Sequence, residues 1–233
     1  MYGTVKQTST WVWGASGKHP VVKDYIRIGQ DTPFMDALSR RIEEGYPNVA
    51  GGTHMRSWRF FARGIKPQEL SCGLVRDSRD GAGRPFPLLI MGSGVLEKWE
   101  RCWEYLPYSL SDLWERMEYI SAKRIFDLSE LKGDIMRLPA PPLPEWEKVV
   151  DESGPRPIPE QQDGMLAIPL SAAGDYREEI VHLLRRVGER HHAVPDSVFM
   201  GGTLSRSFLV VFLRSLGAQD FVRLWSIDEK GEL

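Results

Sequence analysis

Apolar residues alternate with polar ones, or form short apolar runs between turn residues, in several segments of the chain. Such segments are typical of β-strands. The expected strands cover residues 9–15, 57–64, 70–78, 84–92, 164–171, 196–202 and 206–216. Because three of them follow one another between positions 57 and 92 with short connections, the sequence predicts a meander there.

Apolar residues at spacings of three and four indicate helices elsewhere in the chain. The clearest helix begins after Thr32, a favourable N-cap, and ends near Gly45. Pro33 suits its first turn, where a missing N–H leaves no hydrogen bond unmade. The preceding segment, residues 17–30, carries glycine and proline and is expected to be an ordered loop.

A longer helical pattern runs from Val95 to about Leu131. Its first helix carries an apolar stripe that Pro107 interrupts, and a second helix restarts near Ser109 or Ser111. The stripe of the first helix comprises Leu96, Trp99, Trp103 and Leu106. We interpret the tryptophans as core residues, because an aromatic platform for nucleic-acid bases is accompanied by a basic groove.

The last third of the chain predicts an amphipathic helix over residues 175–192 and a terminal helix over 218–225. Asp175 and Glu178 resemble a capping box at the start of the amphipathic helix. Residues 139–163 are rich in proline and charge, which favours an extended connector. The alternative for this segment is a polyproline-like ligand for an aromatic-lined groove of a partner.

Strands and helices are interspersed, with a hairpin-like run early and a β-α-β pattern late. The expected fold class is therefore α/β, with a mixed sheet flanked by helices in three layers. At 233 residues the chain is predicted to form a single domain that contains the proline-rich connector.

Composition narrows the classes of function. The formal net charge is -2, from 30 basic and 32 acidic residues, so no overall field favours nucleic acid or an anionic membrane. Two cysteines without metal-ligand spacing favour a reducing compartment and hence a cytoplasmic location. The N-terminus lacks a secretory-signal pattern, and the apolar runs are far shorter than the roughly 20 residues of a membrane-spanning helix. We therefore expect neither nucleic-acid binding nor membrane insertion.

The candidate chemistry is concentrated in residues 78–90, whose sequence is SRDGAGRPFPLLI. The glycines could cradle a phosphate, but the segment lacks the Gly-Lys-Ser/Thr ending of a Walker loop and leads into a strand. In a turn, Asp80 folds onto backbone N–H groups and Arg84 is held in one direction. Arg84 is then either an internal clamp on the turn or half of a docking surface for a partner's carboxylate or phosphate.

The sequence contains no Gly-x-Ser-x-Gly elbow, no dinucleotide-binding fingerprint and no Cys/His cluster. We therefore predict no catalytic residue, no cofactor and no metal ion. The Asp-Gly pair that begins at Asp80 leaves one enzymatic alternative, a small metal-dependent phosphoester hydrolase.

Three blocks of spaced residues resemble the type VI secretion-associated family called TagF or ImpM. The first is Gly-Lys-x-Pro followed by Asp-Tyr-Ile within residues 17–26, and the second is residues 57–64. The third and most specific is the Ser-x-Asp-x-x-Gly-Arg-x-Phe-Pro-Leu word of residues 78–88. The chain departs from the family pattern at Lys23, where glycine is usual, and at Arg76-Asp77, which replaces an apolar residue and a proline.

The resemblance implies a cytoplasmic, non-enzymatic accessory protein that represses the type VI secretion system after translation by contact with the forkhead-associated scaffold Fha. It also implies an α/β fold with a longin- or SNARE-like core. In some relatives the domain is joined to a PP2C-type phosphatase, which is expected to be a separate polypeptide here. The expected polar part of the binding surface is Lys18, Asp24, Asp80 and Arg84. Besides the hydrolase, the remaining alternative is a structural subunit of the secretion apparatus.

Overall fold

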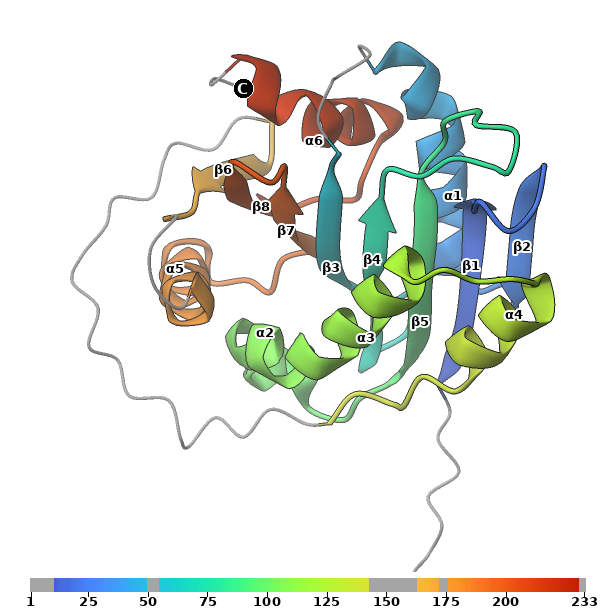
Figure 1. Cartoon of the computed structure of the whole chain (residues 1–233). Coiled ribbons are helices and arrows are strands. Elements are labelled where there is room, and N and C mark those ends of the chain that lie inside the picture. The colour runs from blue at the N-terminus through green and yellow to red at the C-terminus, as the bar shows by residue number, and fades with distance from the viewer. Residues whose placement is uncertain (1–10, 50–54, 143–162, 172–175, 231–233) are drawn as a thin grey trace, which may run out of the picture.

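The computed structural model describes residues 11–49, 55–142, 163–171 and 176–230 (Figure 1). Eight strands form one sheet in the order β2-β1-β5-β4-β3-β7-β8-β6. The strands are β1 Val12–Lys18, β2 Tyr25–Gly29, β3 Ser57–Arg63, β4 Glu69–Arg76, β5 Leu88–Val95, β6 Met165–Pro169, β7 Ser197–Gly202 and β8 Ser207–Phe212. The predicted meander is confirmed, because β3, β4 and β5 are neighbours in the sheet.

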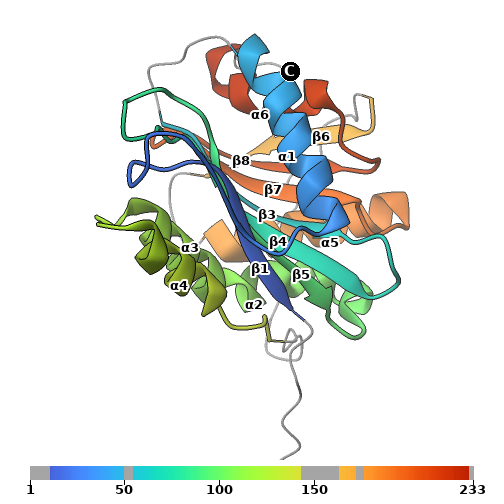
Figure 2. The ribbon, with the colours of Figure 1, turned by 90° about the vertical axis from the view of Figure 1, so that its right-hand side faces the viewer.

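Helices cover both faces of the sheet, as the edge-on view in Figure 2 shows. They are α1 Pro33–Gly45, α2 Leu106–Ser109, α3 Ser111–Ala122, α4 Leu128–Met136, α5 Tyr176–His191 and α6 Ala218–Lys230. Apolar residues of α1 and α6 pack on one face, and those of α2, α3, α4 and α5 pack on the other. The fold is therefore α/β in three layers, as predicted.

The prediction of a mixed sheet is wrong. Every neighbouring pair of described strands is antiparallel. The β-α-β unit at the C-terminal end is present, but β8 lies between the two strands that α5 joins. Since β6 and β7 both pair antiparallel with β8, they run in the same direction without sharing a hydrogen-bonded edge.

The tryptophans of the predicted helical stripe are core residues, as expected. Trp99, Trp103 and Trp114 are all buried on the face that α2 to α5 cover. The opposite face is also aromatic, with Phe60 stacked on Phe199 at a centroid distance of 5.4 Å. Burial on both faces explains why several strands read as continuous apolar runs rather than as strict alternation.

Two sequence predictions about element boundaries are wrong. Residues 17–30 do not form a loop throughout, because β2 pairs with β1 and buries Ile26 and Ile28 on the sheet. The first helix expected after Val95 is replaced by two 3-10 turns, η2 Trp99–Arg101 and η3 Trp103–Tyr105, followed by the short α2. Pro107 lies in the first turn of α2, where its missing N–H is tolerated, so it begins a helix instead of interrupting one.

Other expectations about helix ends are met where the structure describes them. The Thr32 hydroxyl accepts a hydrogen bond from the Met35 amide at 3.2 Å, which confirms the N-cap of α1. A helix restarts at Ser111, one of the two positions expected. The capping box at Asp175 and most of the connector, residues 143–162, lie outside the described residues.

Asp77 ties α6 to the sheet. The Trp225 indole donates to Asp77 Oδ1 at 2.7 Å, and the Arg56 amide donates to Asp77 Oδ2 at 2.8 Å. The indole and the carboxylate thus join the last helix to the end of β4 and to the residue that precedes β3. A hydrogen bond between a buried donor and a carboxylate contributes more than one between neutral groups.

Replacing Trp225 with phenylalanine is therefore expected to destabilise the protein by about 1.5–3 kcal/mol more than the same replacement at Trp58. Trp58 is equally buried, but its indole nitrogen has no hydrogen-bond partner among the described residues. Urea unfolding of both variants separates the hydrogen bond from the loss of indole volume. Equal destabilisation by the two replacements would show that the bond to Asp77 adds nothing.

Candidate functional site

The predicted site lies where two loops meet at one end of the sheet. We call this contact between residues 19–24 and residues 77–87 the loop corner. The Gly81 amide donates to the Val22 carbonyl at 2.6 Å, and the Arg84 guanidinium donates to the Lys23 carbonyl. Figures 1 and 2 show the two loops side by side beyond β1, β2 and the end of β4. Segments about 60 positions apart in the chain are therefore held together by backbone and side-chain bonds.

Asp80 is the centre of the loop corner, and its side chain is completely buried. Its Oδ1 accepts from the backbone amides of Ala82 at 3.0 Å and Arg84 at 2.9 Å. Its Oδ2 accepts from Arg84 Nε at 2.7 Å and lies 3.2 Å from Lys18 Nζ. Both carboxylate oxygens are thus engaged by donors of the same chain, which is the arrangement of a structural carboxylate.

The environment keeps Asp80 ionised. Burial by itself raises the pKa of a carboxyl group, but the hydrogen bonds from Arg84, Lys18 and Ala82 outweigh it and lower the pKa of Asp80 to about 2. At neutral pH the loop corner therefore holds one negative charge between two positive ones. A divalent ion at Asp80 would have to displace these donors.

Arg84 forms several hydrogen bonds within the loop corner although its side chain is partly exposed. Its guanidinium bonds to Asp80 and to the Lys23 carbonyl, while its own carbonyl accepts from the Asp80 amide at 3.1 Å. These are the contacts of an internal clamp. The side chain is nevertheless 58% exposed, so more than half of it faces solvent. Arg84 thus holds the turn together and at the same time exposes part of its side chain to solvent.

Three of the four predicted surface residues come together, and the fourth does not. Lys18 reaches both Asp80 and the Arg84 carbonyl. Asp24 is exposed, and its described hydrogen bond is the local one that it accepts from the Tyr25 amide at 2.8 Å. Asp24 therefore lies in the same loop region without joining the buried charge cluster.

The remaining motif residues explain why the loop corner is rigid. Gly17 has φ +117, and a Cβ built on it would lie 2.0 Å from the Pro87 carbonyl oxygen. Phe86 packs edge-on against Tyr25 and Tyr46, at centroid distances of 5.7 Å and 5.2 Å. Glycine at position 17 therefore permits a contact between β1 and the residue before β5 that any side chain would prevent.

Sequence reasoning missed part of this arrangement. Tyr46 follows α1 and belongs to none of the three blocks of the resemblance, yet it completes the aromatic contact around Phe86. The backbone carbonyls of Val22 and Lys23 also carry no sequence signal, because every residue has one. Their roles depend on which loops meet in space.

The described residues lack two features that would indicate particular functions. No group of three or more His, Cys, Asp or Glu side chains with metal-binding geometry occurs among them. No described helix combines the length and the apolar character needed to cross a bilayer.

Comparison with known proteins shows the fold and no family. No family model matches the sequence, and no curated protein matches it. The crystal structure of PA0076 from Pseudomonas aeruginosa PAO1 is similar, with a TM-score of 0.59 and 20% sequence identity. The similarity covers 95% of this chain and 96% of that chain. Nearly the whole α/β arrangement therefore occurs in another protein with a very different sequence.

Proposed function

We propose that the protein is a non-enzymatic accessory protein of the type VI secretion system, a post-translational repressor that acts by contact with an Fha-type scaffold in the cytoplasm. The observation that carries the proposal is the loop corner. The first and third blocks of the TagF/ImpM resemblance lie far apart in the chain, and they meet there through Lys18, Asp80 and Arg84. The two blocks thus contact each other in the fold, which gives a physical reason why both occur in the same sequence.

The loop corner has the properties of a docking element. Arginine has five N–H donors, and the described hydrogen bonds of Arg84 engage two of its nitrogens. Because the guanidinium is already oriented, little side-chain entropy is lost when it binds a carboxylate or phosphate of a partner. Asp80 is buried beneath it, so the polar part of the contact comes from Arg84 and the exposed Asp24 nearby.

Two finer expectations belong to the same proposal. We propose that the sheet and its helices are a longin- or SNARE-like core, and that any PP2C-type phosphatase of the pathway acts as a separate chain. The similarity to PA0076 over almost the full length supports a shared fold.

Replacing Arg84 with alanine is expected to weaken capture of the cognate Fha protein about tenfold or more and to raise type VI secretion. The matched control is Arg41→Ala, because Arg41 is a half-exposed arginine of α1 that pairs with the exposed Glu44. Pull-down with purified Fha and secretion from cells that carry each variant measure the two effects. Thermal unfolding establishes that both variants are folded.

The possible outcomes test the docking surface at Arg84 and the regulatory function separately. If Arg84→Ala is folded and binds Fha as tightly as Arg41→Ala, Arg84 does not belong to the docking surface. If deletion of the whole gene leaves type VI secretion unchanged, the regulatory function itself is contradicted. Repression that persists in a strain without Fha would exclude Fha as the partner.

A further inference from the structure

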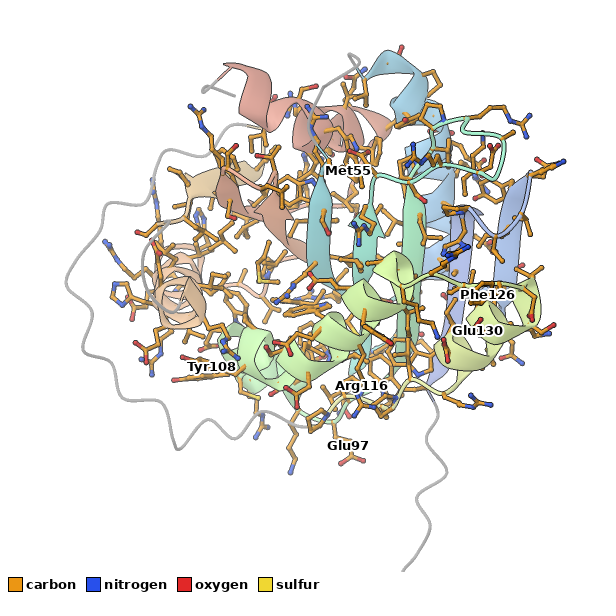
Figure 3. All side chains as sticks on the ribbon, viewed as in Figure 1. Met55, Glu97, Tyr108, Arg116, Phe126 and Glu130 are labelled. Atoms are coloured by element: carbon orange, nitrogen blue, oxygen red, sulfur yellow. The ribbon has the colours of Figure 1, made fainter. Side chains whose placement is uncertain are left out.

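A groove of about 910 Å³ lies at the same end of the sheet as the loop corner, but its lining shares no residue with Lys18, Asp80 or Arg84. It is bordered by the beginnings of β3 and β8, by the ends of β4, β6 and β7, and by one residue each of α3 and α6. In Figure 3, Met55 marks its rim between α6 and the upper end of β3. No motif in the sequence predicts this groove.

Strand register explains why the groove exists. Three successive rows of side chains cross β4, β3, β7 and β8 on the face that α2 to α5 cover. The rows are Cys72-Phe61-Val198-Val211, then Leu74-Arg59-Met200-Leu209, and finally Arg76-Ser57-Gly202-Ser207. The first row is buried and apolar, whereas the last row carries one long side chain and three small residues. The sheet therefore ends in a shallow trough.

At the end of β7 the backbone lies very close to β3, and on the trough face Gly202 adds no side chain. Gly201 has φ +150, and a Cβ built on it would lie 2.0 Å from the Ser57 carbonyl oxygen. Only glycine allows β7 to approach β3 this closely. The backbone of the trough is thus packed tightly while the space above it stays open.

The lining of the groove carries more cationic than anionic side chains. Its lining contains Arg56, Arg59, Arg76 and Arg206 but a single carboxylate, Glu118. The whole chain, by contrast, has a formal net charge of -2. A local excess of arginine in a nearly neutral protein, placed on concave walls, focuses a positive potential on the space between them.

Arg59 and Arg76 differ in whether a carboxylate offsets their charge. Arg59 forms a bidentate pair with Glu118, with Nε and Nη2 each 2.8 Å from a carboxylate oxygen, so most of its charge is offset. Arg76 donates to the Ser121 hydroxyl at 2.8 Å. A hydroxyl orients the guanidinium without neutralising it, so Arg76 keeps its full charge towards the groove.

An apolar group stands beside the cations. Leu204 is fully exposed at the tip of the turn between β7 and β8, and Met55, which precedes β3 and also lines the groove, is 52% exposed. The turn is ordered, because the Thr203 amide donates to the Arg206 carbonyl at 3.0 Å. Leu204 and Met55 thus place apolar side chains beside the arginines of the groove lining.

We propose that this groove binds an extended acidic peptide segment of a partner protein, with carboxylates on the arginines and an apolar side chain against Leu204. The cations and the adjacent apolar rim match a peptide that carries both kinds of side chain better than they match a small anion. The site is independent of the proposed function, because it does not require that the partner be Fha.

A fluorescein-labelled octapeptide with four glutamates and two leucines tests the proposal by fluorescence polarisation on the full chain. The wild type is expected to bind it, and Arg76→Glu to bind at least about tenfold more weakly. Leu204→Ser is expected to weaken binding severalfold without a change in charge. The control Arg41→Glu on α1, outside the groove, is expected to bind as the wild type does.

Several results would overturn the proposal. These are equal binding by folded Arg76→Glu and Arg41→Glu, equal binding of a peptide with glutamine in place of glutamate, and no binding at millimolar peptide. If Arg76→Glu does not fold, Arg76→Gln and Leu204→Ser decide the matter. Displacement of the peptide by submillimolar inorganic phosphate, or tighter binding of a single-stranded oligonucleotide, would assign the groove to a phosphate ligand instead. Unchanged peptide binding by Arg84→Ala is expected and keeps this test separate from the Fha experiment.

Discussion

Replacing Gly17 with alanine is expected to disrupt the loop corner and to lower the free energy of unfolding by about 3 kcal/mol or more. Two costs add up at this position. The backbone has φ +117, which side chains other than hydrogen rarely adopt, and the new methyl group would meet the Pro87 carbonyl oxygen at 2.0 Å. Because that oxygen belongs to the backbone before β5, it cannot move aside as a side chain would. Urea unfolding followed by tryptophan fluorescence measures the loss.

Gly83 provides the matched control for Gly17. Its φ is +83, but a Cβ at this position would meet nothing within 4 Å. Gly83→Ala therefore carries the conformational cost without the clash, about 1–2 kcal/mol. If Gly17→Ala proves no more destabilising than Gly83→Ala, β1 does not pack against Pro87 as described.

Replacing Asp80 with asparagine is expected to lower Tm at neutral pH by about 5–10 °C. The change leaves the amine of Lys18 and the guanidinium of Arg84 without their shared carboxylate, and the amide group would present N–H donors to other donors. The control is Asp24→Asn, because Asp24 is exposed and its described hydrogen bond is local. Calorimetry of the two variants should show a large shift for Asp80 and almost none for Asp24.

The stabilising effect of Asp80 also has a predicted pH dependence. Its pKa is about 2 in the folded protein, below the ordinary value of 3.8 that applies when the chain is unfolded. A lowered pKa stabilises the fold above the unfolded value and ceases to do so as pH falls through the folded value. The difference in Tm between wild type and Asp80→Asn should thus be constant above about pH 5 and should shrink between pH 4 and pH 2. A difference that stays the same at pH 2.5 would contradict an ionised Asp80 in the loop corner.

Local patterns in the sequence predicted most of the elements, and the exceptions have identifiable causes. The cap at Thr32 depends on residues within one turn, and the structure confirms it. The strand β2 was missed because its two buried residues, Ile26 and Ile28, follow a segment with glycine and proline that is typical of a loop. Pro107 was misjudged because a proline can begin a helix as well as interrupt one, and only the backbone before it decides which.

The same distinction applies to the loop corner. The pair Asp80 and Arg84 lies four residues apart within one turn, so the chain itself brings the two together. Lys18, at the end of β1, and the carbonyl of Lys23, in the loop that follows, come from a distant part of the chain. Their distances to Asp80 and Arg84 depend on the antiparallel pairing of β1 with β5. The sequence therefore indicated the local pair of Asp80 and Arg84, whereas the contacts of this pair with Lys18 and the Lys23 carbonyl depended on the sheet.

By itself the sequence determined the α/β class, the capped start of α1 and the tight turn around Asp80, because each of these depends on residues that are neighbours in the chain. The tertiary structure alone decided that the sheet is antiparallel throughout and that Arg59, Arg76 and Arg206 share one groove. These arginines are separated by up to about 150 positions, and cross-strand register rather than any local preference places them together.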